Sequence, residues 1–201
     1  MGMALFLLVI VVLFGGVLGW GLGTYNGLVQ ARNRYRNAFA QIDVQLQRRF
    51  DLIPNLVEAA RAYMAHESQT LEAVIAARSA AMGGLAAAKA RPGDARAMEQ
   101  LAQGQGQLDG ALGRLMMVSE AYPELKANTT MLQLGEELTS TENRVGFARQ
   151  AFNDAVTDYN NRREMFPGSL VAGPFNFELA SLLEIAAQQR EQVRAAPRIT
   201  F

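Results

Sequence analysis

The first residues to consider are those that could bind a metal or act as a base. His66 is the single histidine of the 201-residue chain, and His66-Glu67 begins like the zinc-binding motif H-E-x-x-H. Position 70 is a threonine, so the second histidine ligand is missing. The chain has no cysteine, which excludes thiolate catalysis and Cys-ligated zinc. We expect His66 and Glu67 to make polar contacts within the fold, with a carboxylate-based metal site as the alternative.

The remaining candidate motifs are incomplete. No serine lies in a G-x-S-x-G setting, and GQGQLDG at residues 104–110 is followed by no Gly-Lys-Ser/Thr, so it is not a phosphate loop. On a helix, the glycines at 104, 106, 110 and 113 favour close backbone packing, with easy deformation as the alternative. A di-metal bundle site needs two Glu-x-x-His motifs, which one histidine cannot supply. The sequence therefore predicts no catalytic, cofactor-binding or metal-binding residues.

Residues 1–24 are predicted to be a transmembrane anchor. Every side chain before Arg32 is uncharged, and as a helix the apolar stretch 4–23 spans about 30 Å, the thickness of a bilayer core. Trp20 and Tyr25 stand where an aromatic belt would lie. A cleaved signal peptide is the alternative, but the basic n-region of such peptides is absent.

The flanks of the anchor predict its orientation. Arg32, Arg34 and Arg36 follow the apolar stretch, whereas the N-terminal side carries only the α-amino group. The positive-inside rule then predicts a single-pass protein of the bacterial inner membrane with most of its chain in the cytoplasm. A periplasmic body is the alternative. Acidic and basic residues balance at 19 each, so the net charge predicts no nucleic-acid partner.

The anchor carries a repeated glycine spacing. Gly15, Gly19, Gly23 and Gly27 recur every four residues and share one helix face. Small residues at this spacing let transmembrane helices approach closely. We expect this face to be an oligomer contact, so the protein's partners include itself and the lipid bilayer. The alternative is that glycine is simply common in membrane helices.

Beyond the anchor, apolar residues recur at alternating three- and four-residue steps, which predicts long amphipathic helices and an all-α fold. Turn signals at residues 91–94, 122–123 and 166–168 separate the helices. Asp94 is expected to cap one helix, and Thr130 with Gln133 to form a capping box for another. The prediction is an N-terminal transmembrane helix continuing into an antiparallel up-down four-helix bundle, plus a short helix at about 178–193.

The stretch QRRFDLIPNLVE, residues 47–58, places a proline inside a helical pattern. Asp51 could cap a new helix with Pro54 in its first turn, where no N–H is needed, and this corner is the favoured interpretation. A kinked continuous helix is the alternative. Two basic pairs, Arg48-Arg49 and Arg162-Arg163, are expected on solvated faces or, near the membrane, against anionic lipid.

The loop at residues 166–177 holds much apolar surface. Phe166, Phe175 and Phe177 are its candidate contact residues, for the membrane or for a partner. They could pack on the end of the bundle, on a neighbouring subunit or against lipid headgroups, and internal packing is the default expectation.

Three stretches resemble the LemA family. They are residues 25–67 (from YNGLVQARNRYRNAF to MAHE), residues 122–168 (from YPELKANTTMLQ to REMFPG) and the tail APRITF at 196–201. Gly135 and Phe152 stand where the family pattern has Gln and Tyr. The resemblance implies a bacterial membrane anchor (1–24), a helical bundle (25–167) and a C-terminal loop, short helix and tail (168–201). It implies no enzymatic activity and no catalytic residues.

Two hypotheses of function follow, with a third held against them. The leading one is a non-enzymatic, membrane-anchored scaffold that forms a homo-oligomer in the bacterial cell envelope. The alternative is an adaptor that binds another membrane protein, such as a protease or sensor. The third is a carboxylate enzyme, with or without a metal ion.

Overall fold

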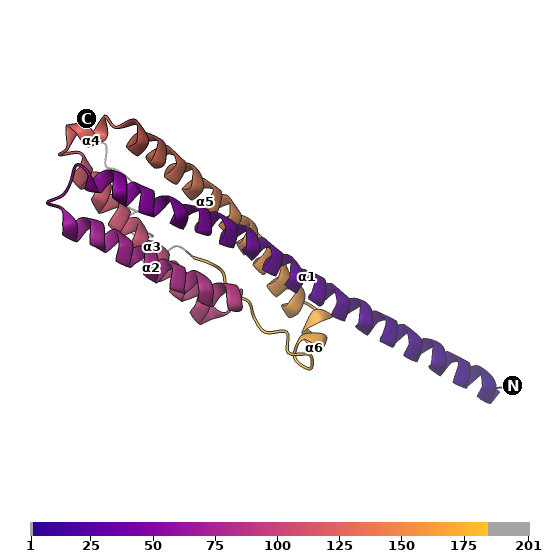
Figure 1. Cartoon of the computed structure of the whole chain (residues 1–201). Helices are drawn as coiled ribbons and strands as arrows, with labels where there is room; N and C mark the ends of the chain where they lie inside the picture. The colour runs from indigo at the N-terminus through magenta and orange to yellow at the C-terminus, as the bar shows by residue number, and fades with distance from the viewer. Residues whose placement is uncertain (1, 185–201) are drawn as a thin grey trace, which may run out of the picture.

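The computed structural model describes residues 2–184, and its regular elements are all helices (Figure 1). In chain order they are α1 (Gly2–Arg61), α2 (Ser68–Ala90), α3 (Ala95–Ser119), α4 (Pro123–Lys126), α5 (Thr129–Glu164) and α6 (Gly168–Ala172). The all-α class and the long apolar N-terminal helix are therefore confirmed. The N-terminal part of α1 projects beyond the other helices, and residues 2–20 are exposed (Figure 1).

Helix α1 is continuous over 60 residues and contains Pro54 in its interior. The predicted corner capped by Asp51 is wrong, because the chain turns only after Arg61. An interior proline cannot donate to the carbonyl four residues earlier, which here belongs to Phe50. Nε of Arg78 on α2 donates to that carbonyl oxygen instead, at 2.8 Å. A neighbouring helix thus satisfies the group that the proline leaves unpaired.

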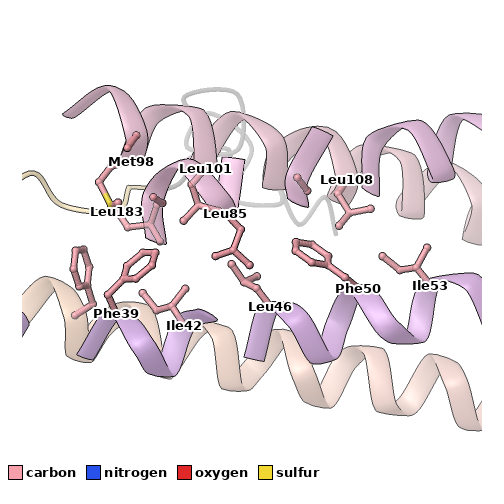
Figure 2. Packing of buried hydrophobic residues seen from close by; sticks show 14 of the residues in the cluster. Phe39, Ile42, Leu46, Phe50, Ile53, Leu85, Met98, Leu101, Leu108 and Leu183 are labelled. Carbon is pink, nitrogen blue, oxygen red and sulfur yellow. The ribbon is translucent and has the colours of Figure 1, made fainter. Parts of the chain in front are cut away.

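The core lies between α1 and the α2–α3 pair (Figure 2). The side chains facing the core from α1 recur at three- and four-residue steps, as the sequence pattern predicts. All those labelled on both sides are at most 5% exposed. They are Phe39, Ile42, Leu46, Phe50 and Ile53 of α1, Leu85 of α2, Met98, Leu101 and Leu108 of α3, and Leu183.

The long helices form two closely packed pairs. Helix α1 packs along α5 and also against α2, and α2 packs along α3. Tyr35 of α1 joins the first pair by edge-on ring contacts with Phe152 and Tyr159 of α5, at centroid distances of 6.2 Å and 5.2 Å. Helices α3 and α5 make far less contact. The closed up-down four-helix bundle stays a prediction.

Two glycines allow α2 and α3 to approach closely. A Cβ at Gly84 would lie 2.8 Å from the carbonyl oxygen of Gln100, and one at Gly104 would lie 2.9 Å from Cα of Ala81. Both clashes are with backbone, which a side-chain rotation cannot relieve. The packing interpretation is confirmed for Gly104. It does not hold for Gly110 and Gly113, where a Cβ would meet no atom of the described residues within 4 Å.

The helix caps were predicted in part. The side chain of Asp94 accepts a hydrogen bond from Ala97 N at 2.9 Å, so this cap is confirmed. The predicted capping box at Thr130 is wrong, because α5 begins at Thr129 and Asn128 is its cap, accepting from Met131 N at 3.0 Å. Asparagine serves as well as threonine at this position, so composition alone does not separate the two.

Residues 177–184, here called the strap, contain no helix. The short helix expected at about 178–193 is therefore wrong for 178–184, and the rest of that range lies outside the described residues. The strap backbone bonds to other parts of the fold: Ser181 N donates to the carbonyl oxygen of Gly93 at 2.7 Å, and Tyr159 Oη donates to that of Glu178 at 2.7 Å. These partners replace the hydrogen bonds that a helix would make within itself.

Candidate functional site

The glycine face of the anchor touches no other part of the described chain. A Cβ placed at Gly15, Gly19, Gly23 or Gly27 would meet nothing within 4 Å outside its own helix. The side chains around this face are exposed as well, including Leu18 at 51% and Leu22 at 63%. The face is therefore open to lipid or to another helix at Gly15, Gly19 and Gly23, and Gly27, at its end, is half-buried with room for a Cβ.

Residues 166–177, which include α6, return to the level where α1 leaves its apolar stretch. The ring of Trp20 lies 5.5 Å from that of Phe166, and the ring of Tyr25 lies 5.0 Å from Phe175 and 5.5 Å from Phe177, measured between centroids. We call these five residues the aromatic collar. Aromatic pairs of this kind contribute about 0.5–1.5 kcal/mol beyond the burial of their area. The collar thus packs residues 166–177 against α1 at the position of the predicted aromatic belt.

The candidate residues of the loop have different surroundings. Phe177 is only 2% exposed, and the guanidinium carbon of Arg32 lies 4.9 Å from its ring centroid. Phe166 and Phe175 are 73% and 58% exposed. Phe177 therefore anchors the loop internally, whereas the other two present apolar surface next to the anchor. Rings with one face packed and the other open suit the headgroup region of a bilayer.

The basic residues near the collar bond to other parts of the chain. Arg163 Nε donates to the carbonyl oxygen of Phe177 at 2.7 Å. Arg162 and Arg34 both contact the carboxylate of Asp158, at 3.0 Å and 3.1 Å. The predicted pair Arg162-Arg163 thus has partners within the chain. Arg34 is the most open of these cations, with a side chain 60% exposed.

The residues considered for catalysis lie far along the sequence from the collar and do not form a cluster. His66 is exposed, and the expected polar contact of Glu67 is made by Tyr122, whose hydroxyl donates to the carboxylate at 3.3 Å. Desolvation and this carboxylate raise the pKa of Tyr122 above its usual value. Within residues 2–184 no group of three His, Asp or Glu side chains could hold a metal ion.

A second place of interest is Arg49, which was expected on a solvated face. It is 4% exposed, and its guanidinium bonds to Asp109 at 2.6 Å and to the side-chain oxygen of Gln105 at 3.3 Å. It borders an open groove of about 910 Å³ between α3 and α5. Arg49 lies three residues after Leu46 and four before Ile53 in the apolar seam, and this spacing could have indicated its burial.

Length and composition would let two of the described helices cross a membrane, α1 and α2. The apolar window of α1 is wholly exposed, whereas 33% of that of α2 is buried in the fold. An exposed apolar helix that continues into a helical body, with an aromatic collar where they meet, is typical of a membrane-associated helical protein.

Comparison with known proteins narrows this class to one family. The model of the LemA family matches residues 38–201. Magnetosome protein MamQ of Magnetospirillum gryphiswaldense is 26% identical over 163 residues, covering 74% of this chain and 60% of that protein. Magnetosome protein MamQ 2 of Paramagnetospirillum magneticum is 25% identical over 175 residues, covering 80% of this chain and 64% of that protein. The chain spans less than two thirds of the length of these relatives.

The chain belongs to the LemA family, and it is a membrane-associated helical protein.

Proposed function

We propose that this protein is a non-enzymatic scaffold of the bacterial cell envelope, anchored in the inner membrane by one span and assembled as a homo-oligomer. The observation that supports it is the open glycine face of the anchor at Gly15, Gly19, Gly23 and Gly27. In this proposal α1, α2, α3 and α5 run up and down from the bilayer, and the aromatic collar rests at its surface.

The glycine face supports self-association for an energetic reason. A glycine inside a helix costs about 1 kcal/mol relative to alanine. No other part of the described chain packs against these four glycines. In a bilayer, close approach of two helices over small residues supplies van der Waals contacts that lipid does not. A second copy carries the same face, so the two can meet symmetrically.

Native mass spectrometry of the full-length protein in mild detergent tests this assembly. The wild type is expected to give one defined oligomer, and Gly19→Leu with Gly23→Leu is expected to give monomer. Gly21→Leu is the control, because it adds a leucine about 200° around the helix from Gly19 and should leave the oligomer intact. A wild-type monomer, or an oligomer unaffected by the double substitution, contradicts the proposal.

The proposed orientation places the body in the cytoplasm, because Arg34 and its neighbouring arginines follow the span. The chain has no cysteine, so a single Ser79→Cys can report the side. A membrane-impermeant maleimide should label this cysteine only after the cells are opened. Labelling in intact spheroplasts would show the periplasmic alternative.

A second function is supported by the exposed rings of Phe166 and Phe175, which are 73% and 58% open. An adaptor that binds another membrane protein, such as a protease or sensor, could present them to its partner. Phe166→Ser with Phe175→Ser tests this without disturbing the buried Phe177. Loss of a cross-linked partner in membranes with the homo-oligomer intact favours the adaptor, and retention of the same partner removes it.

A further inference from the structure

The strap is held against α5 by two asparagine brackets. The side chain of Asn160 donates to the carbonyl oxygen of Ala180 at 2.8 Å and accepts from its N–H at 3.0 Å. Asn153 makes the same pair of bonds with Leu183, at 3.2 Å and 2.9 Å. Ala180 and Leu183 are also buried. Each bracket therefore fixes both the position and the direction of the strap backbone.

The two brackets define a register. Seven residues of α5, about 10.5 Å of helix, match three residues of the strap, about 10 Å of extended chain. As residue numbers rise along the strap they fall along α5, so the strap runs toward the N-terminal half of α5. Two further steps of seven on α5 reach Gly146 and then Thr139. If the same register continued, positions 186 and 189 would match them.

Thr139 lies at the groove between α3 and α5. This groove has a volume of about 910 Å³ and is bordered by the second half of α3, by Lys126 of α4 and by residues 131–143 of α5. Its apolar lining comes from Leu112, Met116, Met131, Leu132 and Leu138. The groove is therefore open and partly apolar, and its α5 residues, 131–143, lie further along α5 in the direction in which the strap runs.

The charges of the groove and of the chain beyond the strap are complementary. Glu120, Glu136 and Glu142 line the groove with Lys126, while Arg49 and Asp109 at its border pair with each other. The sequence 185–201 has three arginines and one glutamate. It also has apolar residues to match the lining, namely Ile185, Val193, Ile199 and Phe201.

The chain beyond the strap is also long enough to reach the groove. From the level of Asn153 to that of Met131, α5 advances about 33 Å. The sequence 185–201 has 17 residues and can span up to about 56 Å when extended. The segment can therefore reach every part of the groove without leaving its own molecule.

We propose that the α3–α5 groove is a binding surface for an extended basic peptide, and that its occupant is residues 185–201 of the same chain, running antiparallel to α5. The peptide would lie on the side of the fold where α3 and α5 make few contacts. This proposal does not depend on the glycine face of the anchor, so it can be tested separately from the proposed oligomer.

Disulfide formation in the full-length protein tests the register, because the native chain has no cysteine. Gln189→Cys is combined either with Thr139→Cys or with Thr157→Cys. Both threonines are exposed, and they are 18 residues apart, which is five helical turns, so they share one face of α5. The Thr139 pair is expected to oxidise within one molecule at least tenfold faster than the Thr157 pair.

A charge reversal in the groove supplies a second test. Glu136→Lys in the groove should slow the Thr139 cross-link severalfold, whereas Glu137→Lys beside it, outside the groove lining, should not. Circular dichroism verifies that the variants keep their helices. Equal rates for the two threonine pairs, no Thr139 cross-link, equal effects of the two lysine substitutions, or cross-linked dimers in place of closed monomers would each overturn the proposal.

Discussion

Replacing Arg78 by methionine removes the donor that satisfies the Phe50 carbonyl above Pro54. A buried acceptor left unpaired costs about 1–3 kcal/mol, and the partial exposure of this bond places the cost at about 1–2 kcal/mol. For a chain of this size that lowers the melting temperature by about 2–8 °C. Thermal unfolding of the full-length protein in detergent, followed by circular dichroism, measures it.

The refutation comes from a double-mutant cycle. Pro54→Ala supplies an N–H four residues after Phe50 and should raise stability by itself, since proline inside a helix costs about 3 kcal/mol relative to alanine. In the Pro54→Ala background, Arg78→Met should cost at least 1 kcal/mol less than in the wild type. The reason is that the alanine N–H at position 54 can then donate to the Phe50 carbonyl, so the hydrogen bond from Arg78 is no longer needed. Arg96→Met, an exposed arginine of α3, is the control and should have an effect within about 0.5 kcal/mol. Equal costs of Arg78→Met in both backgrounds would refute the reasoning.

Three further predictions concern the folded body. Gly84→Ala should lower the unfolding free energy by about 1–3 kcal/mol because its Cβ meets the α3 backbone, whereas Gly83→Ala, with open space, should raise it by up to about 1 kcal/mol in denaturant titrations. Asp109→Asn should cost about 1–3 kcal/mol, since it replaces the charged partner of the 4% exposed Arg49 by a neutral acceptor. Arg49→Met should cost less, because the Asp109 side chain it leaves is 26% exposed and water can reach it. Burial, above all, raises the pKa of Tyr159, so the unfolded chain releases this proton first and stability should fall as pH rises above about 10. Tyr159→Phe should make that alkaline loss smaller in melts at several pH values.

The helical class was predictable because apolar periodicity reports which face of a helix is buried. The seam through Phe39, Ile42 and Leu46 of α1 is buried in the structure as the spacing indicates. Phe166, Phe175 and Phe177 could be singled out as apolar residues in a loop. Their separate surroundings could not, because ring contacts with Trp20 and Tyr25 join residues more than 140 positions apart.

Two of the misses share a physical cause, which is a backbone group satisfied by a distant side chain. Pro54 predicts a corner only if nothing else can bond to Phe50, and Arg78 is supplied by another helix. Likewise, over residues 178–184 the expected helix is displaced by hydrogen bonds from Asn153 and Asn160. Local sequence patterns do not contain such long-range partners.

The most direct test of the proposed assembly uses single cysteines placed one at a time along residues 15–27 of this cysteine-free chain, oxidised in native membranes. The account predicts that disulfide-linked dimers form most at positions 15, 19, 23 and 27 and least at position 21. Uniformly absent dimers, or a maximum at position 21, would contradict it.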